Sequence, residues 1–72
     1  MLKEITTADL AREYDLTTRA IRHYEALGLI CPARRGRTRI FSQRDKVRVG
    51  LIARGRRLGL ALEEIREIID LY

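Results

Sequence analysis

The most constraining feature of this 72-residue chain is a pair of helix starts with very little chain between them. Thr6 has the character of an N-cap, and Asp9 completes a capping-box pattern with it, so a helix is predicted over residues 6–14. Thr17 has the same character and begins a second predicted helix over residues 17–27, which Gly28 ends. So short a connection forces the two helices to pack against each other.

The connection between these helices has the composition of a tight turn. Ala11 offers the small side chain that close helix contact needs, and Asp15 tolerates the left-handed conformation that such a turn requires. Leu16 and Ile21 then bury the second helix against the first. This spacing is typical of a helix-turn-helix, whose second helix enters the DNA major groove by its N-terminal residues. An ordinary helical hairpin is the alternative that the helix pair alone leaves open.

Two further helices are predicted downstream. Ser42, followed by Asp45 in a second capping-box pattern, begins a helix over residues 42–58, whose apolar stripe is expected to comprise Val47, Leu51, Ile52 and Leu58. The last helix is expected over residues 61–72, although Ala61 is a poor cap. Its buried face is expected to comprise Leu62, Ile65, Ile68, Ile69 and Tyr72.

Residues 30–41 interrupt the helical pattern. The segment opens at Pro32, turns around Gly36 and ends in alternating residues, which predicts a short β-hairpin. The predicted fold class is therefore mainly α: a winged helix-turn-helix of four helices, with a short β-hairpin wing between helices 2 and 3. A hairpin carrying four arginines suits a wing against DNA, and an exposed connecting loop is the alternative.

Length and composition limit the classes of protein that this chain can represent. A second core cannot be fitted, so one domain is expected. The single cysteine, Cys31, excludes an internal disulfide and a metal site of several thiolates within the chain, and no metal or other cofactor is expected. No apolar run approaches the ~20 residues of a membrane span, and no secretory signal is present. A cytoplasmic protein without a membrane partner is expected.

Positive charge is concentrated in the middle of the chain. Between residues 34 and 57, ten basic side chains oppose one acid, Asp45. Thirteen of the fifteen cations are arginine, which suits bidentate contacts to phosphate and guanine better than lysine does. The block indicates a polyanionic partner, but charge alone does not distinguish nucleic acid from an acidic membrane surface. A solvated basic face is the structural alternative.

The second predicted helix supplies candidate DNA contacts: Thr17, Thr18, Arg19, Arg22, His23 and Tyr24. Hydroxyls and free backbone N–H groups in its first turn can meet phosphate. Arg22 lies one turn on from Arg19, so both can project from one face. His23 can donate a hydrogen bond to phosphate, and a lone histidine indicates no metal site. Tyr24 fits the core and a contact equally well, because it follows Ile21 at helical spacing.

Four stretches together resemble the N-terminal half of MerR-family regulators, a bacterial family that controls transcription. Residues 5–13 and 17–30 are similar to its helix-turn-helix, with Arg-His-Tyr-Glu at 22–25 in place of an Arg-aromatic-Tyr-Glu run and Gly-Leu-Ile at 28–30 in place of Gly-Leu-Leu. Residues 39–45 resemble its Arg-x-Tyr-Ser-x-x-Asp wing end. Residues 58–65, Leu-Gly-Leu-Ala-Leu-Glu-Glu-Ile, resemble its Leu-Gly-Phe-Ser-Leu-Glu-Glu-Ile signature.

The resemblance implies a winged helix-turn-helix domain over residues 1–72 that binds double-stranded promoter DNA sequence-specifically. Carried over by position, it adds wing contacts from Arg37, Arg39 and Phe41. His23, Phe41 and Ala61 depart from the family pattern, which has another aromatic residue, Tyr and Ser there. The resemblance also implies a homodimer formed through a coiled coil after residue 72, followed by an effector-binding region; both lie outside this chain.

Three other classes of function fit the residues less well. An enzyme is not expected, because one Cys, one His and one Ser cannot assemble a nucleophile–base–carboxylate set, and no glycine-rich phosphate loop is present. An RNA binder is expected to expose stacking aromatics, and most of the four aromatic residues have core spacing. An excisionase-like architectural DNA-binding protein without an effector domain is the principal alternative, since such proteins are about this short.

Overall fold

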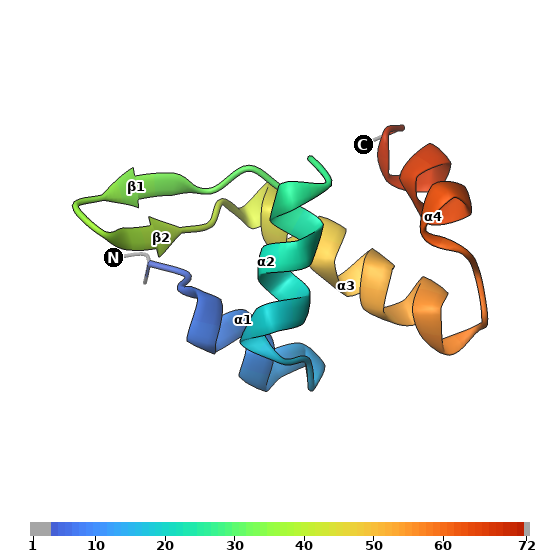
Figure 1. Cartoon of the computed structure of the whole chain (residues 1–72), viewed down its shortest axis with the longest axis horizontal. Helices are drawn as coiled ribbons and strands as arrows, with labels where there is room; N and C mark the ends of the chain where they lie inside the picture. The colour runs from blue at the N-terminus through green and yellow to red at the C-terminus, as the bar shows by residue number, and fades with distance from the viewer. Residues whose placement is uncertain (1–3, 72) are drawn as a thin grey trace.

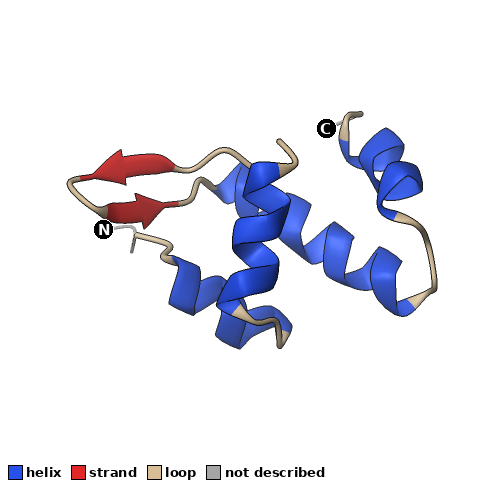
Figure 2. Ribbon diagram, viewed as in Figure 1, coloured by secondary structure: helices blue, strands red, loops and turns tan. Residues whose placement is uncertain are grey.

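The computed structural model describes residues 4–71 and shows a helical body from which a β-hairpin projects (Figure 1). Figure 2 distinguishes the helices from the two strands. In chain order the elements are α1 (Thr7–Tyr14), α2 (Thr18–Ala26), β1 (Ala33–Arg35), β2 (Thr38–Ile40), α3 (Gln43–Arg57) and α4 (Leu62–Ile69). The predicted fold class is confirmed. None of the helices within residues 4–71 is long and apolar enough to cross a membrane.

The helix starts are fixed by the caps that the sequence predicts. Thr6 Oγ1 accepts a hydrogen bond from the backbone N–H of Asp9 (3.2 Å), and the Asp9 carboxylate accepts one from the N–H of Thr6 (3.0 Å). Thr17 Oγ1 accepts from the N–H of Ala20 (3.0 Å), which caps α2. Ser42 Oγ accepts from the N–H of Asp45 (3.0 Å), which caps α3. These contacts confirm the three predicted cap residues.

The turn between α1 and α2 has the predicted left-handed residue. Asp15 lies at φ 54° and ψ 50°, and it is the only residue other than glycine with a positive φ within residues 4–71. The N–H of Leu16 donates to the carbonyl of Ala11 (2.9 Å), which closes the end of α1. α2 therefore crosses α1 at a fixed angle and presents its opposite face to solvent.

The buried face of α3 includes Ile52, as predicted, but it is otherwise turned away from the predicted stripe. Val49 and Ile52 are fully buried, whereas Val47 is 49% exposed and Leu58 is 73% exposed, so the predicted stripe is wrong at those two positions. Leu51 is half-buried. The physical reason is that α3 carries apolar residues on two faces, and helical spacing fits both. Its contacts with α1 and α4 decide which one is buried.

The helix α4 packs across α3 and is shorter than predicted. Ile65 and Ile69 are buried as expected, but Ile68 is 43% exposed. The helix ends at Ile69, with Asp70 as its C-cap, and a turn follows instead of the predicted continuation. Ile68 is exposed because α3 covers only one side of this short helix. The predicted burial of Tyr72 lies outside the described residues.

The hairpin is antiparallel and joined by a two-residue turn. Arg35 pairs with Thr38, Arg34 with Arg39 and Ala33 with Ile40. Gly36 has a φ of +60° at the first turn position, a conformation that glycine adopts without steric cost. At the base of the hairpin, the N–H of Phe41 donates to the carbonyl of Ile5 (2.8 Å), which ties β2 to the segment before α1.

Candidate nucleic-acid interface

The exposed face of α2 brings four of the predicted contact residues together. Thr18, Arg19, Arg22 and His23 are all exposed. Neither Arg19 nor Arg22 forms a hydrogen bond or an ion pair within residues 4–71. Thr17 is exposed as well, but its hydroxyl caps the helix. This face therefore offers two guanidinium groups whose donors are free to meet an external acceptor.

The opposite face of α2 holds the helix against the body. Ile21 is fully buried, and Tyr24 is only 7% exposed. The Tyr24 ring lies beside His23, with ring centroids 6.2 Å apart and planes tilted by 50°. Tyr24 was equally compatible with core and contact from its spacing, and the structure places its side chain in the core. Its packing makes the outer face of α2 a rigid platform.

The four wing arginines occupy different environments. Arg34 and Arg37 are exposed and have no hydrogen-bonding or ionic partner within the described residues. Arg35 forms an ion pair with Glu4. Arg39 Nε lies 2.7 Å from Glu25 Oε1 on α2, and only 22% of its side chain is exposed. Of the two arginines predicted to contact DNA from the wing, Arg37 is free and Arg39 is engaged.

Phe41, predicted as a wing contact from the family pattern, is 3% exposed and belongs to the core. Its ring packs where β2 meets the body, at the bridge to Ile5. Asp45 fixes the other end of the hairpin, because its buried carboxylate accepts a hydrogen bond from the N–H of Cys31 (3.2 Å). Both residues hold the base of the wing in place.

Two sets of exposed cations belong to the basic block of residues 34–57 but are not among the individually predicted contact residues. One is Arg34, which the strand register leaves free. The other is the last turn of α3, where Arg54, Arg56 and Arg57 are exposed. In the view of Figure 1 the wing lies on one side of α2, and this end of α3 lies on the other. The dense arginine run includes these residues, but it does not distinguish exposed arginines from those paired within the fold.

The whole arrangement has the size of a DNA-binding module. The longest extent of the domain is 34 Å, which is about one helical turn of B-DNA. A helix with a basic outer face, flanked on both sides by arginines, can place its side chains in the major groove while the flanks meet phosphates. No group of three His, Cys, Asp or Glu residues within 4–71 could hold a metal ion.

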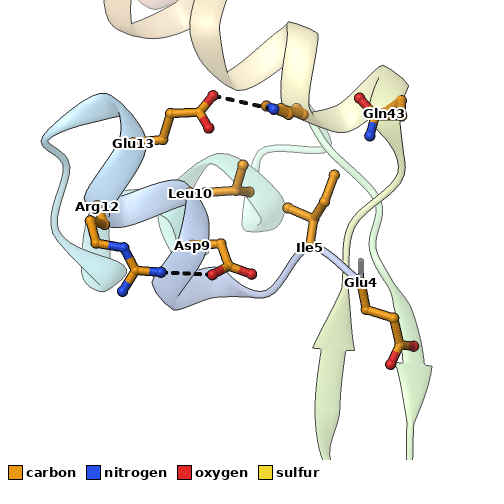
Figure 3. A pocket seen from close by; sticks show the side chains of 8 residues that line it. Glu4, Ile5, Asp9, Leu10, Arg12, Glu13 and Gln43 are labelled. Carbon is orange, nitrogen blue, oxygen red and sulfur yellow. Dashed lines mark hydrogen bonds and ion pairs between the residues drawn. The ribbon is translucent and has the colours of Figure 1, made fainter. Parts of the chain in front are cut away.

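An open groove of about 460 Å³ lies between α1, the start of α3 and the segment before α1. Figure 3 shows the side chains that line it. Its carboxylates face cations of the same domain. Asp9 contacts Arg12 (2.8 Å), and Glu13 lies 3.5 Å from Lys46 Nζ. These pairs neutralise much of the charge in the groove. The unpaired arginines of α2 and the wing are therefore the better candidate site.

Comparison with known proteins gives a consistent result. The chain matches the family model for the MerR HTH family regulatory protein over residues 5–71. It is 34% identical over 67 residues to the HTH-type transcriptional regulator CueR of Salmonella typhi, covering 90% of this chain and 49% of that relative. It is 38% identical over 58 residues to the HTH-type transcriptional regulator HmrR of Rhizobium leguminosarum bv. viciae, covering 79% of this chain and 45% of that relative.

A third relative is the transcriptional regulator BrlR of Pseudomonas aeruginosa, which is 36% identical over 64 residues. That match covers 85% of this chain and 24% of the relative. The chain thus spans about half the length, or less, of these curated relatives. The excisionase-like alternative finds no support among these matches.

Proposed function

We propose that this chain, which belongs to the MerR family of helix-turn-helix regulatory proteins, is the DNA-binding domain of a transcription regulator. It is proposed to recognise promoter DNA through α2. The observation that carries the proposal is the exposed face of α2, where Arg19 and Arg22 stand without partners inside the described domain. Guanidinium groups on a helix of this kind match the acceptor edge of guanine and the phosphate oxygens.

The position of each side chain suggests a division of roles. Arg19 lies in the first turn of α2, where a side chain reaches deepest into a major groove, and is proposed to read a guanine. Arg22, Thr18 and His23 are proposed to contact the adjacent backbone. Arg37 and Arg34, on the wing, are proposed to meet phosphates or the neighbouring minor groove.

The intact protein is proposed to act as a homodimer on a two-fold operator. One half-site gives a single α2 few base contacts, and two half-sites one helical turn apart supply the rest. A coiled coil after residue 72 is the proposed dimerisation element. A regulator of this kind works in the cytoplasm, at the chromosome, and no catalytic activity is proposed for it.

Binding to two duplexes tests the proposal. One duplex is enriched from a random-sequence pool by selection on the wild-type chain, and the other is its scrambled counterpart. Fluorescence anisotropy should show tighter binding to the selected duplex. It should also show an affinity that falls steeply with salt, because neutralised phosphates release counterions. Equal affinity for both duplexes would contradict sequence-specific recognition. An affinity that does not change with salt would contradict the proposed electrostatic contacts to phosphate.

A further inference from the structure

The two strands of the wing are buried to different extents against the body of the domain. Every residue of β1 is exposed, whereas Arg39 and Ile40 of β2 are half-buried. The base of the hairpin is fixed by backbone contacts at Cys31 and Phe41. Beyond this base, the wing is held to the body only by side-chain contacts on its two faces.

The contact on the α2 face is an ion pair between Arg39 and Glu25. Arg39 Nε donates to Glu25 Oε1 over 2.7 Å, and the two side chains are 22% and 26% exposed. Partial withdrawal from solvent makes such a pair less screened than a fully exposed one. Glu25 lies in the last turn of α2, so the pair joins the wing to the helix proposed to enter the groove.

The strand register explains why this acid is needed. Arg34 pairs directly with Arg39, so their side chains project from the same face of the hairpin. Like charges in directly opposed positions destabilise a strand pair. Glu25 neutralises Arg39, and Arg34 on the same face has no partner within residues 4–71. On the other face, Arg35 is paired with Glu4.

We propose that Glu25 is a positioning residue that acts through Arg39 to set the angle between the wing and α2, so that Arg34 and Arg37 reach the backbone beside the groove that α2 enters. A carboxylate on a DNA-binding helix would otherwise only repel phosphate. The inference rests on the proposed function, because it concerns how the same interface is assembled.

Substitution of Glu25 separates positioning from simple charge. Glu25→Gln removes one negative charge, and electrostatics alone therefore predicts tighter binding to DNA. Loss of positioning predicts the opposite, which is roughly five- to tenfold weaker binding to the selected duplex, because Arg34 and Arg37 would no longer be held beside the DNA backbone. Glu13→Gln is the matched control. It also removes one acid and one ion pair between elements, that of Glu13 with Lys46, in the groove of Figure 3.

The experiment combines anisotropy with hydroxyl-radical footprinting at saturating protein, so that the protected positions do not depend on affinity. Glu25→Gln should lose protection on the wing side of the site while the positions under α2 stay protected. Glu13→Gln should keep the full wild-type footprint. Thermal unfolding followed by circular dichroism checks that each variant is folded, since a merely destabilised domain would not narrow its footprint at saturation.

A double-mutant cycle tests whether Glu25 acts through its partner. If it does, adding Glu25→Gln to Arg39→Gln costs little further affinity, whereas independent effects add. Additive losses would overturn the inference, as would a Glu25→Gln variant that binds as tightly as wild type with an unchanged footprint. If the wild-type chain itself does not prefer the selected duplex, the proposed function fails, and the inference fails with it.

Discussion

Gly55 is the glycine of residues 4–71 at which an added methyl group would approach a neighbouring side chain most closely. It lies in α3 at the crossing with α4 and is buried. A Cβ atom added there would lie 2.8 Å from Cγ1 and 2.9 Å from Cδ1 of Ile65. Both distances are well inside van der Waals contact, and Ile65 is only 1% exposed. Gly55→Ala therefore forces α4 to move, or Ile65 to leave its rotamer.

Two opposing contributions set the net change in stability. Alanine is favoured over glycine inside a helix by about 1 kcal/mol, which stabilises the variant. Overpacking a core by one methyl group costs about 1–3 kcal/mol. The upper part of that range applies, because a β-branched residue in a helix has one strongly preferred χ1 rotamer and Ile65 cannot swing aside. The expected net loss is about 1–2 kcal/mol, or roughly 4–8 °C in Tm for each kcal/mol in a domain of this size.

Urea unfolding of wild type and Gly55→Ala measures the difference directly. Ile65→Val removes Cδ1, one of the two atoms in the clash. The double variant should therefore be more stable than the sum of the two single losses predicts. Gly50→Ala is the comparison, since its Cβ would meet the Tyr14 ring at 3.1–3.2 Å, a milder contact. A Gly55→Ala variant as stable as wild type would contradict the predicted net loss, because the gain in helix propensity would then match or exceed the cost of the clash.

Four further predictions concern local structure and the roles of single arginines. Ala61→Ser should raise the free energy of unfolding by about 1 kcal/mol, since only the Glu64 half of a capping box is present at the start of α4; urea unfolding measures the gain. Asp15→Ala should lose about 1 kcal/mol in the same assay, because alanine tolerates a left-handed conformation poorly. Arg19→Ala should cost about 1–3 kcal/mol on the selected duplex and little on the scrambled one. Arg37→Ala should weaken binding to both duplexes by a similar factor and lower the salt dependence of log affinity by about one unit of slope. If Arg19→Ala and Arg37→Ala had the same effect on both duplexes, these roles would be contradicted.

The elements that were predictable from sequence are those fixed by neighbouring residues. A cap at Thr6, Thr17 or Ser42 is a contact between groups three residues apart, so the chain itself carries the whole interaction. The left-handed turn at Asp15 is equally local. The same applies to the hairpin, whose turn depends on Gly36. Because these local signals agree with one another, the order of the helices and strands can be predicted from the sequence.

The predictions are wrong where burial depends on an element distant in the sequence. The two apolar faces of α3 look alike in sequence, and only the positions of α1 and α4 select the face that includes Val49 over the one that includes Val47. The predicted end of α4 lies beyond the observed end at Ile69 for a related reason. Apolar spacing continues past Ile69, but no neighbouring element within residues 4–71 covers that side, and the helix gains little from further turns.

The arginines show most clearly what the sequence leaves open for function. Arg34, Arg37 and Arg39 are chemically identical and lie within one hairpin, so composition assigns them the same role. Pairing across the fold separates them, because Arg39 meets an acid on α2, whereas Arg34 and Arg37 meet none within the described residues. An arginine already satisfied by a carboxylate gains little from a phosphate, since the phosphate must replace an existing charge-assisted hydrogen bond. The cations available to DNA are therefore fewer than the basic block suggests, and the paired ones set the geometry in which the free ones act.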